Sequence, residues 1–355
     1  MNRQASLHSQ ALIETATALV DDDKGILAMD ESTPTCNKRL AAVGIPQNEE
    51  FRRAYRELLV TTAGLGNFIS GAILYDETIH QQTRNGTSMI AALKAQGIIP
   101  GIKVDGGTHS LAGHPGESIT EGLDGLRERL TEYARLGARF AKWRAVITIN
   151  DDVPSRGGIE ANAHALARYA ALAQEAGLVP IVEPEVLMDG DHSLARCRDV
   201  TEAVQHAVFA QLRGQGVLLE GIILKPNMVV PGADSPESVS GSVTADMIAQ
   251  ETIDCMLRTV PAAVPGVAFL SGGQTPGQAT ERLNAMHVRQ NLGHTTRNVP
   301  WVLTFSFGRA LQEPVLAIWR GDAANAQAAQ AALLRRAQYN HAALRGAYLA
   351  TMQHS

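Results

Sequence analysis

Residues 163–186, AHALARYAALAQEAGLVPIVEPEV, combine a helix and a strand in one short stretch. In the first part, 163–177, apolar residues recur three and four positions apart, as an amphipathic helix requires. The second part, VPIVEPEV (179–186), is a short run rich in apolar residues, which favours a buried strand. The stretch therefore predicts one helix followed by one strand.

Similar runs recur at fairly even intervals, separated by segments with helical spacing such as EEFRRAYRELLVTTA (49–63). The eight candidate strands are GILAMD (25–30), NFISGAIL (67–74), IIPGIKV (98–104), RFAKWRAV (139–146), VPIVEPEV (179–186), EGIILKPNMV (220–229), GVAFLSGG (266–273) and VPWVLTFSFG (299–308). Strands that alternate with helices form a parallel sheet, and eight such units match a closed barrel. We expect an α/β fold, a single-domain (β/α)8 TIM barrel over residues 1–355, with extra helices at about 7–20 and 322–352.

Composition excludes several classes of protein. Of the 355 residues, 45% are hydrophobic and 19% charged, as in a globular protein rather than a disordered one. The net charge of -5 and the scattered basic residues argue against nucleic-acid binding. No stretch reaches the roughly 18 to 20 apolar residues of a membrane span, and the amino terminus lacks the apolar core of a secretory signal. Three widely spaced cysteines fit a reducing compartment, so we expect a cytoplasmic protein without disulfides.

Charged residues gather at the ends of the predicted strands. Lys142 and Arg144 are two positions apart, as are Glu183 and Glu185, so each pair shares one face of its strand. The ionisable residues that we expect at the barrel mouth are Asp30, Lys103, Asp105, Lys142, Arg144, Glu183, Glu185 and Lys225. Any one of them alone is more often a solvated loop residue. Together they indicate a catalytic site, because mutually perturbed titrating groups cluster there.

Lys225 ends an apolar run that otherwise belongs in a buried strand. An isolated buried ammonium is costly, so such a lysine is paired, neutralised or directed into a wet pocket. Desolvation and a neighbouring ammonium such as Lys142 both favour the neutral amine, which is the nucleophilic form. We therefore predict that Lys225 forms a Schiff base.

Two sets of residues are candidates for anion binding. The seventh and eighth strands end in Ser271, Gly272 and Gly273, and in Gly308 and Arg309, where barrel enzymes commonly bind phosphate. A glycine pair alone is more often a plain turn, but an arginine on the next strand end strengthens the prediction. The second positive set is Lys38, Arg39 and Lys103, whose alternative interpretation is solvated surface charge.

Seven stretches resemble class I fructose-bisphosphate aldolase over nearly the whole chain. They are LAMDEST (27–33), GIKVDGG (101–107), AKWRAV (141–146), IVEPEVLMDGDH (181–192), LKPNMV (224–229), FLSGGQ (269–274) and LTFSFGRALQ (303–312). The resemblance implies reversible cleavage of fructose 1,6-bisphosphate to dihydroxyacetone phosphate and glyceraldehyde 3-phosphate, in glycolysis or gluconeogenesis. It also implies sugar phosphates as ligands, no cofactor, and a homo-oligomer, by family habit a tetramer.

The resemblance assigns a role to each site residue. It implies that Lys225 attacks carbon 2 of the sugar, that Asp30 handles the proton of the carbon-4 hydroxyl, and that Glu183 is the main acid and base. By the same resemblance Glu185 holds Lys225 and Lys142 in place, so that Lys225 lies between Glu185 and Lys142. Ser271, Gly272 and Arg309 match the site of the carbon-1 phosphate. The residues matching the carbon-6 phosphate end are Lys38, Arg39, Lys103 and Arg144.

The sequence leaves rival functions open. Another Schiff-base barrel enzyme, such as a transaldolase-like one, would share the lysine but need not share two phosphate sites. A non-catalytic sugar-phosphate-binding protein would have lost a catalytic group. A metal-dependent aldolase would need ligands, yet His109 and His114 lie in a loop of turn residues without a compact ligand pattern, so we expect no metal.

The sequence also departs from the family. It ends QHS (353–355), without the longer tail ending in tyrosine that many animal members use for proton exchange, and Tyr339 and Tyr348 are expected to be packed rather than catalytic. Pro34 and Thr35 replace a small Gly-Ser pair. The preference between fructose 1,6-bisphosphate and fructose 1-phosphate is therefore open.

Overall fold

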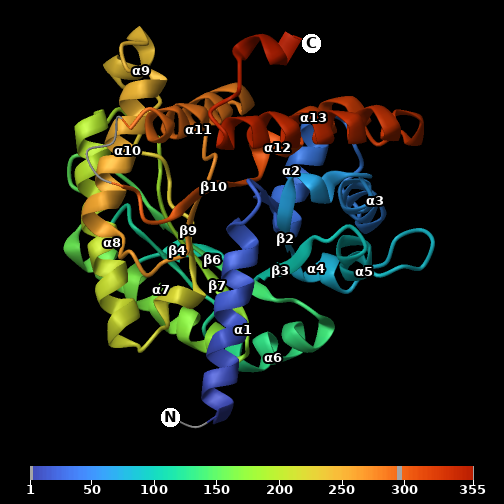
Figure 1. Cartoon of the computed structure of the whole chain (residues 1–355), viewed down its shortest axis with the longest axis horizontal. Coiled ribbons are helices and arrows are strands. Elements are labelled where there is room, and N and C mark those ends of the chain that lie inside the picture. The colour runs from blue at the N-terminus through green and yellow to red at the C-terminus, as the bar shows by residue number, and fades with distance from the viewer. Residues whose placement is uncertain (1–2, 294–297, 355) are drawn as a thin grey trace.

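Eight parallel strands close into a barrel at the centre of the chain (Figure 1). The computed structural model describes residues 3–293 and 298–354. The barrel strands are β1 (Gly25–Ala28), β2 (Ile69–Leu74), β3 (Ile99–Lys103), β6 (Phe140–Ile147), β7 (Val179–Val186), β8 (Ile223–Leu224), β9 (Gly266–Phe269) and β10 (Val302–Phe307). They follow the order β1-β10-β9-β8-β7-β6-β3-β2 around the barrel. Each predicted strand is present, and the predicted (β/α)8 barrel is confirmed.

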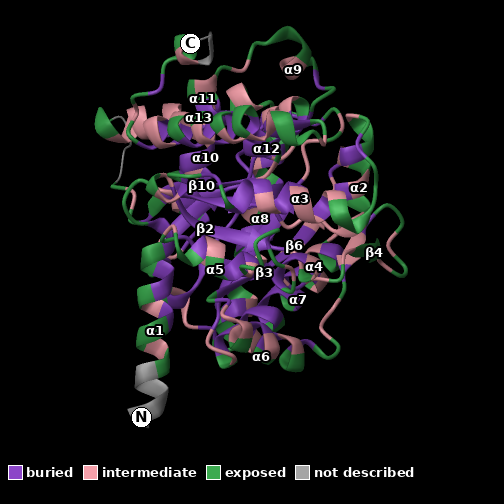
Figure 2. Cartoon of the chain, turned by 90° about the vertical axis from the view of Figure 1, so that its right-hand side faces the viewer, coloured by how far each residue is buried: buried purple, intermediate pink, exposed green. Residues whose placement is uncertain are grey.

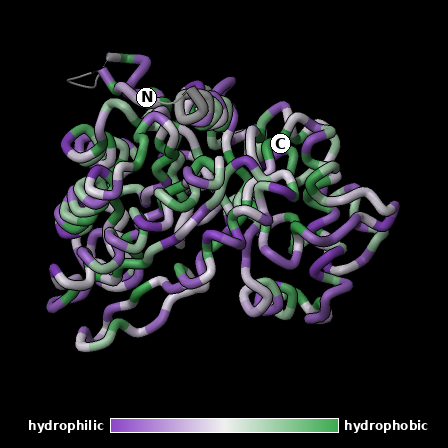
Figure 3. The backbone as a smooth tube through the Cα atoms, turned by 90° about the horizontal axis from the view of Figure 1, so that it is seen from below, coloured by the Kyte–Doolittle hydropathy of each residue, from purple (hydrophilic) through white to green (hydrophobic). Residues whose placement is uncertain are grey.

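Helices surround the barrel. They are α1 (Arg3–Val20), α2 (Thr33–Ala42), α3 (Glu49–Val60), α4 (Asp76–Ile79), α5 (Met89–Lys94), α6 (Leu126–Leu136), α7 (Arg156–Glu175), α8 (Leu194–Gly214), α9 (Pro236–Ser240), α10 (Ala245–Thr259), α11 (Pro276–Asn291), α12 (Arg309–Trp319) and α13 (Ala326–Leu344). Short 3-10 turns are η1 (Leu65–Asn67), η2 (Leu219–Gly221), η3 (Ala323–Asn325) and η4 (Ala350–His354). In Figure 3, hydrophobic and hydrophilic residues alternate along these helices, which fits one face packed on the barrel. None of the helices in the described ranges is long and apolar enough to cross a membrane.

The buried core is continuous from the strands to the inner faces of the helices (Figure 2). Glycines in the strands leave room for aromatic rings inside the barrel. A Cβ atom at Gly101 would lie 2.2 Å from the ring of Phe140, and one at Gly25 would lie 2.3 Å from the ring of Phe305. Only glycine fits at these two positions, because the rings already occupy the space that a larger residue would need.

Helix α1 closes one end of the barrel. Leu19 and Val20 belong to the same buried cluster as Phe140 and Val179, the first residues of β6 and β7. The hydroxyl of Ser70 donates a hydrogen bond to the carbonyl of Leu19 at 2.6 Å. The barrel therefore opens at the carboxyl ends of its strands, where the predicted site residues lie.

The structure differs from the sequence predictions in detail. A small antiparallel hairpin, β4 (Thr108–Ser110) and β5 (Ser118–Thr120), lies where we expected only a loop. Strand β8 has two residues rather than the ten of the predicted run, because Pro226 has no N–H to donate to a ladder. The helical segment expected over 322–352 is divided between η3, α13 and η4, with Gly346 in a left-handed conformation (φ 66°) after α13.

Candidate active site

A cavity of about 680 Å³ opens at the carboxyl ends of the barrel strands. The predicted site residues that line it are Asp30, Lys38, Arg39, Lys103, Lys142, Arg144, Glu183, Glu185, Lys225, Ser271, Gly272, Gly308 and Arg309. Gly273 is exposed and is absent from this lining, and a Cβ atom there would be 2.9 Å from the sulfur of Met188. The structure thus gathers residues from β1, α2, β3, β6, β7 and the segments after β8, β9 and β10 into one space.

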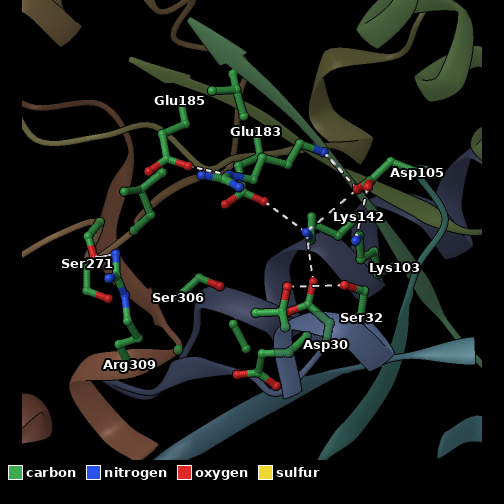
Figure 4. A pocket seen from close by; sticks show the side chains of 18 of the residues that line it. Asp30, Ser32, Lys103, Asp105, Lys142, Glu183, Glu185, Ser271, Ser306 and Arg309 are labelled. Carbon is green, nitrogen blue, oxygen red and sulfur yellow. Dashed lines mark hydrogen bonds and ion pairs between the residues drawn. The ribbon is translucent and has the colours of Figure 1, made fainter. Parts of the chain in front are cut away.

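Alternating charges connect four of these residues in a chain. Figure 4 labels three of them, Asp30, Lys142 and Glu183. The Nζ atom of Lys225 lies 3.0 Å from Oε1 of Glu183. The other oxygen of Glu183 lies 3.3 Å from Nζ of Lys142, which in turn lies 2.7 Å from a carboxylate oxygen of Asp30. The side chains of Lys225 and Lys142 are 5% and 4% exposed. The two lysine side chains are therefore buried and share one carboxylate.

Strand geometry accounts for this arrangement. Lys142 and Arg144 are two apart on β6, and Glu183 and Glu185 are two apart on β7, so each pair points the same way. The β6–β7 register pairs Arg144 with Glu183. Lys225 follows β8 directly, and its backbone N–H donates to the carbonyl of Val182 at 2.8 Å. This hydrogen bond extends the β7–β8 pairing by one residue and directs Lys225 toward β7.

Burial and neighbouring charges shift the pKa values of these linked residues in opposite directions. Burial acts to lower the pKa of Lys142, but the carboxylates of Asp30, Glu183 and Asp105 outweigh it and leave that pKa raised. Burial acts to raise the pKa of Asp30, but Lys142, Lys225 and Lys103 outweigh it and leave that pKa lowered. The pKa of Glu183 is lowered in the same way, chiefly by Lys142 and Lys225 against the effect of burial. Lys142 is thus held as a cation between two carboxylates.

Glu185 has a different partner from the one that we expected. It forms an ion pair with Arg144, and the ion pairs of the described chain include none between Glu185 and Lys225 or Lys142. The expectation that Lys225 lies between Glu185 and Lys142 is corrected in this respect, because Glu183 occupies that place. Glu185 instead lies toward Gly272, where a Cβ atom would be 3.8 Å from its Oε1.

Two positive regions lie at opposite sides of this chain of charges. At one side, Arg309 begins α12 and donates a hydrogen bond to the carbonyl of Gly272, which has a left-handed φ of 53°. Ser271 is buried beside it. At the other side, Lys38 and Arg39 lie on α2. Two cationic ends separated by titrating groups suit a substrate with an anion at each end.

Two buried acidic residues, Asp105 and Glu31, make contacts that the sequence did not indicate. Asp105 lies 3.2 Å from Nζ of Lys103 and 3.8 Å from Nζ of Lys142, so it connects the Lys103 region to the central chain. We expected Asp105 at the mouth but gave it no partner.

Glu31, which follows Asp30, was missed. It accepts hydrogen bonds from Arg39, Arg56 and Gln312. Burial acts to raise the pKa of Glu31, but Arg56 and Arg39 outweigh it and leave that pKa lowered. Its place beside Asp30 in LAMDEST was the one available signal, since Arg56 and Gln312 are distant in sequence.

In residues 3–293 and 298–354, no group of three or more His, Cys, Asp or Glu side chains is arranged to hold a metal ion. His109, one of the two histidines considered above, lies 3.8 Å from a carboxylate oxygen of Glu121 on the surface. The two tyrosines considered in the sequence analysis are packed, as expected. Tyr348 is 5% exposed, and its ring centroid lies 6.2 Å from that of Tyr339.

The sequence and the fold were compared with known proteins. A model of the family described as fructose-bisphosphate aldolase class-I matches residues 11–355. A probable fructose-bisphosphate aldolase class 1 of Xanthomonas campestris pv. campestris is 55% identical over 338 residues, which cover 95% of this chain and 98% of that protein. The cytosolic fructose-bisphosphate aldolase 6 of Arabidopsis thaliana is 49% identical over 98% of this chain and 94% of its own length. A solved structure of fructose-bisphosphate aldolase from Plasmodium falciparum has a TM-score of 0.92 and 45% identity, covering 97% of this chain and 96% of that one.

Proposed function

The chain belongs to the class I fructose-bisphosphate aldolase family, and we propose that Lys225 is the amine through which it acts. It catalyses the reversible aldol cleavage of fructose 1,6-bisphosphate to dihydroxyacetone phosphate and glyceraldehyde 3-phosphate through a lysine Schiff base. What we add is the role of each residue at the barrel mouth.

Lys225 is the proposed nucleophile because it combines burial with an adjacent proton acceptor. Its Nζ atom lies 3.0 Å from Glu183, which accepts a proton as the nitrogen adds to carbon 2 of the keto sugar. Glu183 returns that proton to the former carbonyl oxygen to give the carbinolamine. A second proton, passed through Glu183 from water in the open cavity, lets the hydroxyl leave as water and gives the protonated imine. Lys142, held as a cation 3.3 Å from Glu183, stabilises the carboxylate form of Glu183 before it accepts the proton and again after it has returned it.

Asp30 is the proposed base for bond cleavage. The carbon-4 hydroxyl gives its proton to Asp30, the bond between carbons 3 and 4 breaks, and its electron pair moves into the imine to form an enamine. The lowered pKa of Asp30 keeps it ionised, in the form that can accept a proton. The aldehyde product leaves and Asp30 returns its proton to carbon 3 of the enamine. Water then hydrolyses the imine to release dihydroxyacetone phosphate and free Lys225.

The two positive regions are the proposed phosphate sites. Ser271, Gly272, Gly273, Gly308 and Arg309 belong to the carbon-1 phosphate site, with Gly273 acting through the shape of its loop. Lys38, Arg39, Lys103 and Arg144 belong to the carbon-6 phosphate site. In the described structure Arg39 and Arg144 each pair with a carboxylate, Glu31 and Glu185, which orients their guanidinium groups. Glu185 therefore acts as a positioning residue for Arg144.

The arrangement of Glu183 between two buried lysines is the observation that carries the proposal. Its test is reduction with borohydride in the presence of dihydroxyacetone phosphate, followed by intact mass and peptide mapping. We expect one stable adduct on Lys225 that persists after chelator treatment, and none in Lys225→Met. The matched control is Lys24→Met. It removes a lysine that directly precedes β1, at the end of the barrel away from the cavity, and should leave the adduct in place. An adduct on another lysine would refute the assignment.

We further propose a cytoplasmic homo-oligomer, a tetramer by family habit, with sugar phosphates as its small-molecule partners and without a resident cofactor. Two cytosolic relatives, aldolases 5 and 6 of Arabidopsis thaliana, support the compartment. Light scattering coupled to size-exclusion chromatography tests the assembly. A single species of about the mass of one chain would overturn it.

A further inference from the structure

A second cavity of about 320 Å³ is lined in part by Met188, which lies close to Gly273 in the loop after β9. Its walls come from the loop after β7, the segment after β8, and the region of α9, α10 and α11, which lie together in Figure 1. Met188, Val230, Pro231, Val243 and Ile248 supply apolar walls, and Arg282 on α11 supplies a charge. Glu237, Ser238 and Gln278 also line the cavity, so its apolar walls adjoin several polar groups. Small-molecule sites combine the two kinds of contact.

Arg282 is a half-buried cation without a carboxylate partner. Among the residues that the structure describes, its guanidinium makes one hydrogen bond, from Nη1 to the neutral amide oxygen of Gln274 at 2.8 Å. Burial lowers the pKa of Arg282, and Glu281 opposes this only in part. By contrast, the buried guanidinium of Arg56 pairs with Glu31. Arg282 lines the cavity, so its remaining N–H donors can donate to an acceptor bound there in place of solvent.

We propose that this cavity binds a compact aliphatic monocarboxylate, with the carboxylate on Arg282 and the hydrocarbon part against Val230, Val243 and Ile248. A guanidinium binds a carboxylate through two parallel hydrogen bonds. One feature of the wall selects against more highly charged ligands. Glu237 also lines the cavity, and although its Oε2 accepts from the backbone N–H of Leu194 at 2.7 Å, its charge repels a dianion such as a phosphate ester.

The cavity touches the loop of the proposed carbon-1 phosphate site at two points. Gln274, the hydrogen-bond partner of Arg282, also donates from Nε2 to the carbonyl of Ser271 at 3.1 Å. Met188, from the opposite wall, packs against Gly273. A carboxylate that draws the guanidinium away from Gln274 therefore changes the restraint on Ser271. The consequence is a coupling between the two sites, so that the monocarboxylate changes the KM for fructose bisphosphate.

The test uses the whole chain with a 13C-labelled methionine methyl group, assigned with Met188→Leu. The probe is butyrate, titrated in the presence of saturating fructose 1,6-bisphosphate so that the active site is occupied. We expect the Met188 methyl resonance to shift in a saturable way. n-Butanol, which has the same hydrocarbon chain without the charge, and inorganic phosphate should each bind about tenfold more weakly or less.

Two variants separate the site from general effects on folding. Arg282→Gln should weaken butyrate binding by about tenfold or more, while Arg282→Lys retains part of it. Arg335→Gln, which removes an exposed arginine from α13, is the matched control and should bind butyrate as the natural sequence does. Val243→Trp fills the cavity without altering Arg282 and should also abolish binding.

Three results would overturn the proposal. These are the absence of a saturable shift in the natural sequence, an unchanged butyrate affinity in both Arg282→Gln and Val243→Trp, and tighter binding of phosphate than of butyrate. The borohydride test on Lys225 is independent of all three, because it reads a covalent bond in the other cavity.

Discussion

Glu183 is 3.0 Å from Lys225 through one carboxylate oxygen, and its other oxygen lies 3.3 Å from a second buried lysine, Lys142. In the role that we propose for it, this carboxylate exchanges protons with Lys225 while a fixed cation, Lys142, balances its charge. It would then serve as base and acid in turn without leaving a buried charge unpaired.

Glu183→Gln should lower kcat by about a hundredfold or more, since the amide neither accepts nor returns the proton in carbinolamine dehydration. The measurement is steady-state cleavage of fructose 1,6-bisphosphate, together with the rate of borohydride trapping. Both rates should fall together. The matched control is Glu50→Gln, an exposed carboxylate on α3. A variant that traps normally while losing cleavage would place Glu183 after imine formation.

Asp30→Asn should separate the two halves of the reaction. Asp30 contacts Lys142 rather than Lys225, so imine formation with dihydroxyacetone phosphate should persist while cleavage of the bisphosphate falls about a hundredfold or more. Trapping and cleavage are measured on the same preparation. Equal loss of both activities would contradict the assignment of Asp30 to the carbon-4 hydroxyl.

Arg309→Gln and Lys38→Gln should differ in their dependence on substrate. Loss of a charged contact to phosphate should raise KM by about tenfold or more. Arg309→Gln should do so for both fructose 1,6-bisphosphate and fructose 1-phosphate, because both carry the carbon-1 phosphate. Lys38→Gln should do so for the bisphosphate alone. For each variant, the measurement is the ratio of the KM for fructose 1,6-bisphosphate to the KM for fructose 1-phosphate. A raised KM of Lys38→Gln for fructose 1-phosphate would contradict the proposed orientation of the substrate.

Glu31→Gln should destabilise the fold by about 3 to 5 kcal/mol at pH 7, because it leaves the buried guanidinium of Arg56 without its charge partner. The folded-state pKa of Glu31 is lowered, so its contribution is present above the unfolded value of about 4.3 and is lost as pH falls through the lower folded value. Urea midpoints of the two proteins should therefore converge in acid. If the difference between the two urea midpoints stayed constant from pH 7 to about pH 3, the stabilisation by Glu31 would not come from its charge.

Gly101→Ala should destabilise the barrel by about 1 to 3 kcal/mol or more, because its Cβ atom would meet the ring of Phe140 at 2.2 Å. Gly214→Ala, at the end of α8, is a matched glycine change with nothing within 4 Å, and should stabilise by about 0.5 to 1 kcal/mol. Thermal midpoints decide the matter. If both variants shifted the midpoint in the same direction, the crowding at Phe140 would not be the cause.

The sequence predicted the parts of this structure that follow from repeating patterns. Apolar runs identified the barrel strands, and the two-residue period placed Lys142 with Arg144 and Glu183 with Glu185. The choice of partners was not accessible, because the pairing of Glu185 with Arg144 depends on distances across two strands. The β4–β5 hairpin was missed since Thr108, His109 and Ser110 are all exposed and carry no apolar alternation.

The closure of the barrel by α1 has a practical consequence. The helix lies at the amino ends of the strands, so the chain enters the fold on the side away from the cavity that holds Lys225. A fluorescent protein, an affinity tag or a solid support joined ahead of α1 would leave the mouth open to sugar phosphates. Immobilised enzyme prepared in this way should keep its full turnover, which makes that end the one to choose for a biocatalyst.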